Sequence, residues 1–202
     1  MSHVRLVALA LIVAGCAQDP GYEPRSGDIV FQTSRSSQSL AIQLATKSQY
    51  SHMGIVYVRD GEPLVFEAIQ PVKLTPLRAW IERGEKEHFV AKRLRDADAR
   101  LTPATLERML ATGEQFTGKD YDLYFEWSDE RIYCSELVWK VFERGAGIRL
   151  GEQQTIADFD LSNPAVQAKI KERYGEQVPL NEVVVSPVAI FDAADLVTVY
   201  EN

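Results

Sequence analysis

Apolar residues alternate with polar ones, or recur every three to four positions, in short segments from residue 26 to the end of the chain. Strand-like segments, rich in β-branched and aromatic residues, cover residues 29–32, 53–59, 63–69, 88–95 and 196–200. Helical spacing covers residues 36–48, 77–83, 104–116, 134–144 and 164–175, with a further short segment after residue 186. Neighbouring strands are joined by a hairpin or by a short helix. This order predicts an α+β fold in which one antiparallel sheet packs against helices.

Turn and capping residues indicate where these elements begin. Asp60-Gly61, between two strand-like segments, is typical of a two-residue hairpin loop. Four dipeptides combine an N-cap residue with proline at the first helical position, namely Thr75-Pro76, Thr102-Pro103, Asn163-Pro164 and Ser186-Pro187. We expect a helix to start directly after each of them.

The hairpin predicts which side chains lie on one face of the sheet. With Asp60-Gly61 as a two-residue loop, Glu67 faces Gly54 on the opposite strand. His52 is then a diagonal neighbour of Glu67, with Cα atoms ~7–8 Å apart. Gly54 has no side chain, so the Glu67 carboxylate has room to lean toward the imidazole. Because Glu67 lies in an apolar segment, an unpaired carboxylate there would be costly, and we expect it to have a partner.

Cys134 begins a predicted helix whose apolar stripe it extends by one turn, toward the sheet. The partial positive charge and free amides of a helix N-terminus stabilise a thiolate, and the same amides can hold the oxyanion of a tetrahedral intermediate. A cysteine at a helix start, a histidine on a strand and an acid that orients the histidine together form a nucleophilic triad. Each residue taken alone also fits a structural role, as a core thiol, a structural histidine or a solvated acid.

The first residues have the pattern of an export signal. Arg5 precedes an apolar run over residues 6–13, which is too short to cross ~30 Å of hydrocarbon as a helix. The run ends in Val13-Ala14-Gly15-Cys16 and resembles a bacterial lipoprotein signal, in which the cysteine becomes the lipidated N-terminus. An ordinary cleaved signal with an incidental cysteine is the alternative.

We therefore predict a signal peptide over residues 1–15, a lipidated tether over 16–25 and one hydrolase domain over 26–202. Ala17, rather than an aspartate, follows Cys16. In a Gram-negative cell this favours the cell envelope, with the protein lipid-anchored in the outer membrane and facing the periplasm.

Composition narrows the possible functions. A net charge of −7 without a basic run argues against a nucleic-acid partner. With Cys16 lipidated, Cys134 is a lone thiol in an oxidising compartment, where it is a liability unless it is buried or used. His52, His88 and Cys134 lack the spacing of metal ligands, and a Gly-x-Ser-x-Gly elbow is absent. We expect neither a metal ion nor a cofactor.

Segments around the candidate triad resemble those of a known family. In chain order they are residues 27–31, 50–56, 65–68 and 132–138. They are similar to the permuted papain-like hydrolases, the YiiX/YaeF-like branch of the NlpC/P60 superfamily, which is related to the lecithin–retinol acyltransferase group. The histidine segment precedes the cysteine segment, as it does in the permuted branch. The resemblance spans roughly residues 26–145 and implies a circularly permuted papain-like fold.

The resemblance also implies roles for individual residues. Cys134 is expected to be the nucleophile, His52 the base and Glu67 the group that orients the base. Papain-like enzymes often take a second oxyanion donor from a side chain before the cysteine, and this chain has no unambiguous counterpart. Tyr121, Tyr133 and Gln32 are candidates for that donor or for a substrate contact, and each also fits a structural role.

From these observations we expect an envelope lipoprotein that cleaves an amide or peptide bond, in a cell-wall peptide or similar substrate, through a thioester on Cys134. A lipid acyltransferase or esterase that uses the same Cys-His pair is the alternative. A lipoprotein that binds peptide or cell-wall material without catalysis is the second alternative. The expected partners are a peptide, cell-wall or lipid substrate and the membrane that holds the N-terminal lipid.

Overall fold

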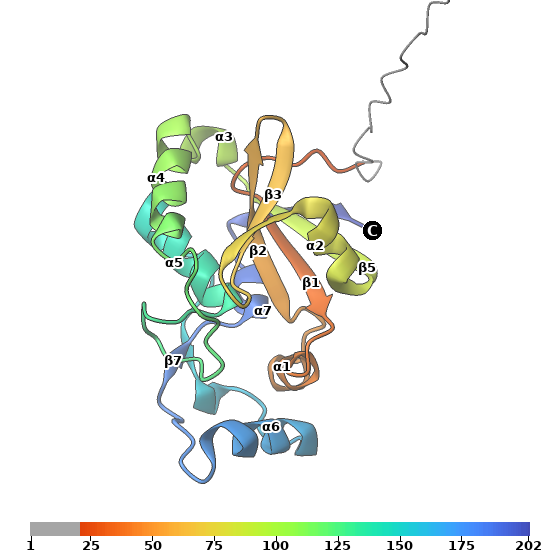
Figure 1. The fold of residues 1–202 in the computed structure, drawn as a ribbon, viewed down its shortest axis with the longest axis vertical. Helices are drawn as coiled ribbons and strands as arrows, with labels where there is room; N and C mark the ends of the chain where they lie inside the picture. Colours follow the sequence, from red (N-terminus) through yellow and green to blue (C-terminus); the bar gives the residue numbers. More distant parts are fainter. Residues whose placement is uncertain (1–20) are drawn as a thin grey trace, which may run out of the picture.

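A six-stranded antiparallel sheet forms the centre of the computed structural model, which describes residues 21–202 (Figure 1). The strands lie in the order β4-β3-β2-β1-β5-β8. Their bounds are Ile29–Ser34 for β1, His52–Arg59 for β2, Glu62–Glu67 for β3, Lys73–Pro76 for β4, Gly84–Leu94 for β5 and Leu196–Glu201 for β8. A second antiparallel pair joins β6 (Gln154–Thr155) to β7 (Val183–Val184). The predicted α+β class with an antiparallel sheet is confirmed.

Helices follow the strands as the capping residues predict, with one exception. They are α1 (Ser39–Thr46), α2 (Leu77–Arg83), α3 (Ala97–Arg100), α4 (Pro103–Glu114), α5 (Cys134–Ala146), η1 (Ile156–Asp158), α6 (Pro164–Tyr174) and α7 (Pro187–Phe191). Side chains of Thr102, Asn163 and Ser186 cap α4, α6 and α7 as predicted. Thr75 does not cap α2, because it lies in β4 and its hydroxyl donates to Glu67 instead. None of the helices in residues 21–202 is both long and apolar enough to cross a membrane.

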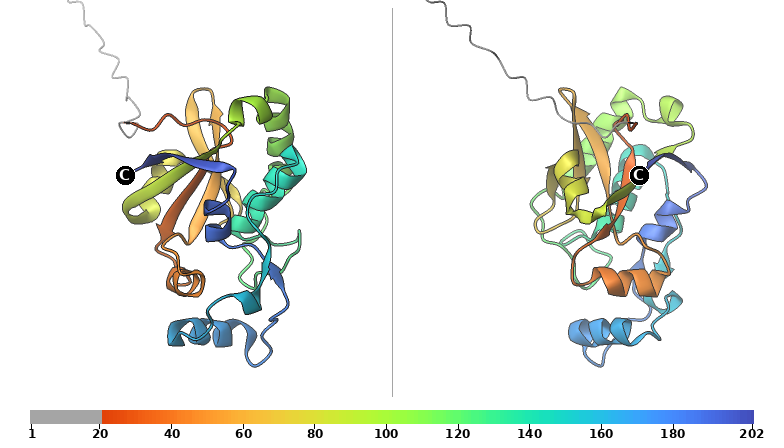
Figure 2. Two further views of the ribbon diagram at one scale, coloured as in Figure 1. Left: turned by 180° about the vertical axis from the view of Figure 1, so that it is seen from behind. Right: turned by 90° about the vertical axis from the view of Figure 1, so that its right-hand side faces the viewer.

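The two faces of the sheet are covered by different helices. The apolar stripe of α5 packs with Ile29, Met53 and Ile55 on one face. Trp80 of α2 packs with Val56 on the other. Beyond one end of the sheet, α1 and α6 lie side by side, at the bottom of every view in Figures 1 and 2. The site described below lies where this end of the sheet meets the first turn of α5.

The hairpin of β2 and β3 has the predicted register. Arg59 pairs with Glu62 and Ile55 pairs with Phe66, as a two-residue loop requires. A Cβ atom on Gly54 would lie 2.5 Å from Val65 Cγ1 and 3.3 Å from Glu67 Cβ. Val65 and Glu67 can therefore occupy their positions only because residue 54 has no side chain.

Two sequence predictions need correction, and two others lie outside the described residues. Tyr22 falls in the predicted tether, yet it is 5% exposed and donates to Asp28 Oδ2 over 2.8 Å, so the packed domain begins by Tyr22 rather than at residue 26. Leu40, which the helical spacing groups with Ala41, Leu44 and Ala45, is 57% exposed, whereas the other three are half-buried. The predicted signal peptide and the lipidated Cys16 lie outside the described residues.

Candidate active site

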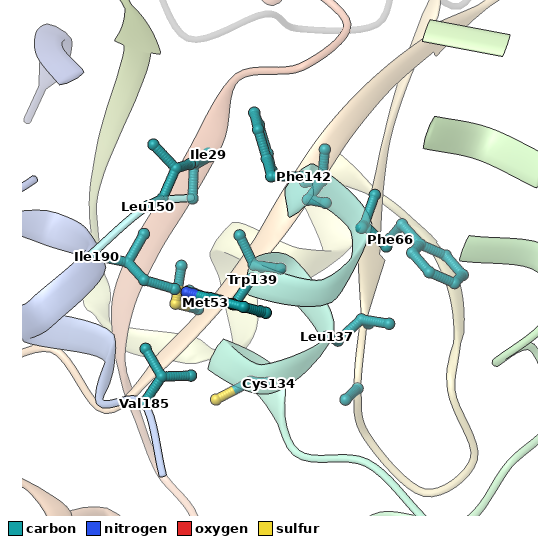
Figure 3. Packing of buried hydrophobic residues seen from close by; sticks show 14 of the residues in the cluster. Ile29, Met53, Phe66, Cys134, Leu137, Trp139, Phe142, Leu150, Val185 and Ile190 are labelled. Atoms are coloured by element: carbon teal, nitrogen blue, oxygen red, sulfur yellow. The ribbon is translucent and has the colours of Figure 1, made fainter. Parts of the chain in front are cut away.

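Cys134 is the first residue of α5, as predicted, and it is 3% exposed. Figure 3 shows its sulfur at the first turn of the helix, on the side toward Val185. The apolar stripe of α5 is fully buried against the sheet and fixes the direction in which the first turn points. The first amides of a helix have no acceptor within the helix, so they are available to a negative charge beside the thiol.

His52 is the first residue of β2, and its ring is held on two sides. Its Nε2 atom lies 2.7 Å from Glu67 Oε2. Its ring stacks on the indole of Trp80, with centroids 6.2 Å apart. The predicted contact between His52 and Glu67 is confirmed, and it leaves Nδ1 as the ring nitrogen that can face Cys134.

Glu67 ends β3 and is fully buried, with both carboxylate oxygens occupied. Thr75 Oγ1 donates to Oε1 over 2.6 Å, and Arg83 Nη2 lies 2.5 Å from Oε1 and 2.6 Å from Oε2. Burial alone would raise the pKa of Glu67. The hydrogen bonds and charge of His52, with the hydrogen bonds of Arg83 and Thr75, outweigh burial and lower that pKa to about 2. The carboxylate is therefore ionised at neutral pH, with the partners that its apolar surroundings require.

His52 connects this carboxylate to the thiol. Burial alone would lower the pKa of His52, but hydrogen bonding to Cys134 and to Glu67, together with their negative charges, raises it to about 9. His52 thus carries a proton at neutral pH. The structure brings Cys134, His52 and Glu67 together from α5, β2 and β3.

A series of hydrogen-bonded polar side chains leads to Cys134 from the side opposite His52. Arg173 Nη2 donates to Gln38 Oε1 over 2.5 Å, and Gln38 Nε2 donates to the Tyr121 hydroxyl over 3.0 Å. A guanidinium can only donate, so it fixes the Gln38 amide with its nitrogen toward Tyr121. The Tyr121 hydroxyl accepts that bond, and its own proton is left to donate to Cys134, its other hydrogen-bond partner.

Tyr121 stays protonated at neutral pH and can act as a donor. Burial, followed by the charge of Cys134, raises the pKa of Tyr121 well above its ordinary value. The backbone holds the residue in place, because its N–H donates to Gln70 Oε1 over 2.7 Å and it forms a parallel bridge with Ile132.

The other two candidate donors lie differently. The hydroxyl of Tyr133 accepts a bond from Val185 N over 3.1 Å, and its ring packs edge-on against Phe125. These contacts tie α5 to its surroundings. Gln32 pairs with His52 across β1 and β2 and is 2% exposed, on the side of the imidazole away from the α5 core. Among the three, Tyr121 is the one whose hydroxyl interacts with the side chain of Cys134.

Four polar residues of the site were absent from the sequence prediction, namely Thr75, Arg83, Gln38 and Arg173. The sequence singled out Thr75, but as the N-cap of a helix, because a proline follows it. The other three lie on α2, beside α1 and on α6, and their contacts arise only when these helices pack around the sheet. No local pattern distinguishes them from other surface residues of a helix.

Two hollows meet at the triad from different sides. A cavity of about 130 Å³ lies between α1, α6 and β7, and Cys134 and Tyr121 are among the residues that line it. A groove of about 410 Å³ on the other side is lined by His52 and Arg83. A substrate whose scissile bond lies at Cys134 can therefore extend in two directions.

Comparison with known proteins identifies relatives over nearly the whole chain. A family model described as permuted papain-like amidase enzymes of the YaeF/YiiX type, the C92 family, matches residues 23–200. The uncharacterized protein YiiX of Escherichia coli strain K12 is 51% identical over 195 residues, covering 96% of this chain and 94% of that protein. A crystal structure of metalloprotein yiiX from Escherichia coli O157:H7 is similar with a TM-score of 0.85 and 53% identity, covering 90% of this chain and 99% of that chain. These findings confirm the predicted resemblance and the predicted permuted fold.

The second relative is described as a metalloprotein. Within residues 21–202, no group of three or more His, Cys, Asp or Glu side chains is placed to hold a metal ion. The residues described here do not fit such an ion, and we assign none to the site.

Proposed function

The chain belongs to the permuted papain-like amidase family, and on this basis we propose that it is a cysteine hydrolase that cleaves an amide bond through a thioester on Cys134. The observation that carries the proposal is the position of His52, whose Nε2 atom lies 2.7 Å from Glu67 Oε2 and whose pKa is raised by its neighbour Cys134. A buried, ionised carboxylate that orients a protonated imidazole beside a thiol is the arrangement that activates a cysteine nucleophile.

The first half of the reaction uses His52 as an acid. The Cys134 thiolate attacks the carbonyl carbon, a C–S bond forms and the carbonyl oxygen becomes an anion. The Tyr121 hydroxyl and the first amides of α5 are placed to donate to that oxyanion. As the C–N bond breaks, His52 gives its proton to the departing nitrogen, and the acyl group remains on sulfur as a thioester.

The second half uses His52 as a base. The neutral imidazole takes a proton from water, and the resulting hydroxide attacks the thioester carbonyl. The C–S bond breaks, a carboxylic acid leaves, and the thiolate and imidazolium are restored. Glu67 keeps its charge throughout and holds the ring in one orientation, as the acid of a triad does.

Trapping of the acyl-enzyme tests this proposal. We expect an activated acyl ester such as p-nitrophenyl acetate to add one acyl group to the protein, detected by intact mass spectrometry and mapped to the peptide that contains Cys134. Hydroxylamine should remove the adduct, since it cleaves thioesters, and acyl p-nitroanilides should show that amides are cleaved as well. Cys134→Ala should lack the adduct. An equal adduct in Cys134→Ala, or none in the folded wild type, would contradict the proposal.

Acyl transfer or ester hydrolysis is the second candidate function, and the apolar cavity that Cys134 helps to line favours it. The thioester would be the same, but an alcohol or amine would replace water as the acceptor. Product analysis with glycerol or glycine added as acceptor distinguishes the two functions, because an acyltransferase yields the acylated acceptor and a hydrolase yields the free acid. If Cys134 forms no acyl-enzyme at all, the non-catalytic binding lipoprotein becomes the leading function.

We further propose that the enzyme acts in the bacterial cell envelope, attached through lipid at Cys16 and facing the periplasm from the outer membrane. The support is the small-residue junction of residues 13–16 after an apolar run. Cell-wall peptides and lipids are both within reach of a protein at that location.

A further inference from the structure

Three charged side chains that the proposed mechanism does not use lie buried around the start of α5. Asp122 and Glu136 are fully buried, and Lys140 is 1% exposed. Glu136 and Lys140 follow Cys134 on α5, and Asp122 follows Tyr121 directly. Removal of charges from water is costly, and neutral residues of similar size can often replace a buried ion pair without loss of stability. These charges therefore indicate a role in fixing geometry rather than in stabilising the core.

The ammonium of Lys140 connects α5 with the loop that precedes it. Its Nζ atom donates to the Ser128 carbonyl over 2.6 Å and to Asp129 Oδ1 over 2.7 Å. Glu136 Oε1, one helical turn before it on α5, forms an ion pair with the same atom over 2.6 Å. A lysine ammonium has three protons and accepts no hydrogen bond, so three oxygen atoms around it fix its position.

The loop in question, residues 115–133, is called the Tyr121 loop below, and its two arms meet shortly before Cys134. Tyr121 forms a parallel bridge with Ile132, and the N–H of Asp122 donates to the Ile132 carbonyl over 3.2 Å. The carboxylate of Asp122 accepts two backbone N–H groups of the loop, over 2.8 and 2.6 Å. Ile132 belongs to the arm that Lys140 holds, so the position of Tyr121 depends on that arm.

Glu136 extends this connection to the first turn of α5. Its Oε2 atom accepts the N–H of Tyr133, the residue before Cys134, over 3.4 Å. Its other carboxylate oxygen is the one that pairs with Lys140. Lys140 is therefore linked, directly or through Glu136, both to the loop that carries Tyr121 and to the turn that carries Cys134.

We propose that Lys140 is a positioning residue: it fixes the Tyr121 loop against the first turn of α5 and so sets the position of the Tyr121 hydroxyl relative to the Cys134 thiol. This inference rests on the proposed function, in which that hydroxyl donates to the oxyanion. Loss of one oxyanion donor costs about 10²- to 10³-fold in kcat. A group that is present but displaced by ~1 Å costs up to about 100-fold. Lys140 acts through Tyr121 and takes no part in proton transfer.

The test removes both charges of the ion pair, in Lys140→Met/Glu136→Gln, because the loss of one partner alone would leave a buried charge unpaired. We expect kcat for p-nitrophenyl acetate to fall about 10- to 100-fold and KM to stay within about twofold, since the oxyanion forms only in the transition state. The midpoint of urea unfolding should stay close to that of wild type. Lys171→Met/Glu176→Gln, which removes an exposed ion pair of 3.7 Å, is the matched control and should keep the wild-type kcat. Wild-type kcat in the folded variant, or a change confined to KM, overturns the inference.

The same double change in a Tyr121→Phe background separates positioning from a general loosening of the site. If Lys140 acts through the Tyr121 hydroxyl, the change should lower kcat less than about twofold further in Tyr121→Phe, because the group that it positions is gone. An equal fall in both backgrounds would mean that the two sites act independently, and it overturns the inference.

A milder variant serves if circular dichroism shows that the double variant is unfolded. Asp129→Asn removes the carboxylate of the Tyr121 loop that Lys140 contacts, at a side chain that is 49% exposed. We expect about a fivefold fall in kcat, which again disappears in the Tyr121→Phe background. Wild-type kcat in Asp129→Asn, or a fall that persists without the hydroxyl, overturns the inference and leaves the proposed function standing. Absence of an acyl-enzyme in the wild type, seen by intact mass spectrometry, overturns the proposed function itself and the inference with it.

Discussion

Two side chains of the site hold opposite charges over a wide range of pH. Glu67, whose pKa is lowered to about 2, stays ionised above that pH, and His52, whose pKa is raised to about 9, stays protonated below it. Between these two values the carboxylate and the imidazolium are both charged. Catalysis that needs the proton of His52 should therefore decline as the pH rises through about 9.

Glu67→Gln removes the charge that helps to raise the pKa of His52. We expect the alkaline limb of kcat/KM to move from about pH 9 toward the ordinary value of 6.5, and kcat to fall roughly 10- to 100-fold because the imidazole is less well oriented. The pH profile of p-nitrophenyl octanoate hydrolysis measures both changes. Glu62→Gln, an exposed position on the same strand, should keep the wild-type profile. If Glu67→Gln keeps the wild-type kcat and the wild-type alkaline limb of the kcat/KM profile, Glu67 has only a structural role.

Alkylation reports the reactivity of Cys134 directly. With iodoacetamide between pH 4 and 9, we expect the rate to rise well below the ordinary thiol value of ~8.5, because an imidazolium and a helix N-terminus both favour thiolate. In His52→Ala the midpoint should move to higher pH, and circular dichroism checks that the variant is folded. Midpoints near 8.5 in both proteins, or labelling only after denaturation, would identify Cys134 as a core thiol.

At the scale of elements, the β2–β3 hairpin brings His52 to Glu67 through a position without a side chain. Gly54→Ala would place a methyl group 2.5 Å from Val65 Cγ1 and 2.8 Å from the Phe66 carbonyl oxygen. We expect a loss of ~1–3 kcal/mol in the free energy of unfolding, typical of overpacking, and a lower kcat as Glu67 shifts. Urea unfolding measures the first effect, and Val58→Ala, on the exposed end of β2, should stay within about 0.5 kcal/mol of wild type. Equal stability of Gly54→Ala and wild type would show that the strands can separate there without cost.

The hairpin, the Cys134 helix and three of the four predicted N-caps could be read from the sequence because each depends on residues close together in the chain. The alternation of side chains along the two strands of this hairpin placed His52 beside Glu67, and it also depends only on residues close together in the chain. The short strands β4, β6 and β7 escaped prediction, since two to four residues carry too little periodicity.

The rest of the site depends on contacts between distant segments. Arg83 reaches Glu67 because α2 lies across the face of the sheet that carries His52. The hydrogen bonds from Arg173 to Gln38 and from Gln38 to Tyr121 connect α6 with the residue before α1, and that residue with a loop. Such contacts depend on tertiary packing, which leaves no regular spacing in the sequence.

At the scale of the whole molecule, the site and the start of the described chain, near Tyr22, lie at different ends. Tyr22, the first buried residue of the described range 21–202, packs against Phe89 of β5 and Tyr200 of β8. Figures 1 and 2 place the entry of the chain at the end of the sheet away from α1 and α6. An anchored domain would therefore direct the apolar cavity away from its attachment, which favours substrates that reach the enzyme from the surrounding space.

Anchoring itself is tested by Cys16→Ser. We expect the variant to leave the membrane fraction and to lose incorporation of labelled palmitate, because the modified cysteine carries the two or three acyl chains that stable attachment requires. The Cys134→Ser variant is the matched control and should remain in the membrane fraction. Continued palmitate labelling of Cys16→Ser would show that the N-terminal segment is not a lipoprotein signal.

In the proposed mechanism, the order of the triad along the chain determines when the protein becomes reactive during its synthesis. His52 and Glu67 belong to one hairpin, whereas Cys134 starts a helix much later in the chain. At ~5–20 residues per second, the ribosome needs roughly 4 to 16 s to go from residue 52 to residue 134. Arg173, which fixes the Gln38 amide that contacts Tyr121, is made later still. A nascent chain therefore carries an acid–base pair without a nucleophile, and attack on cellular acyl groups becomes possible only after the segments that contain Cys134 and Arg173 have been made.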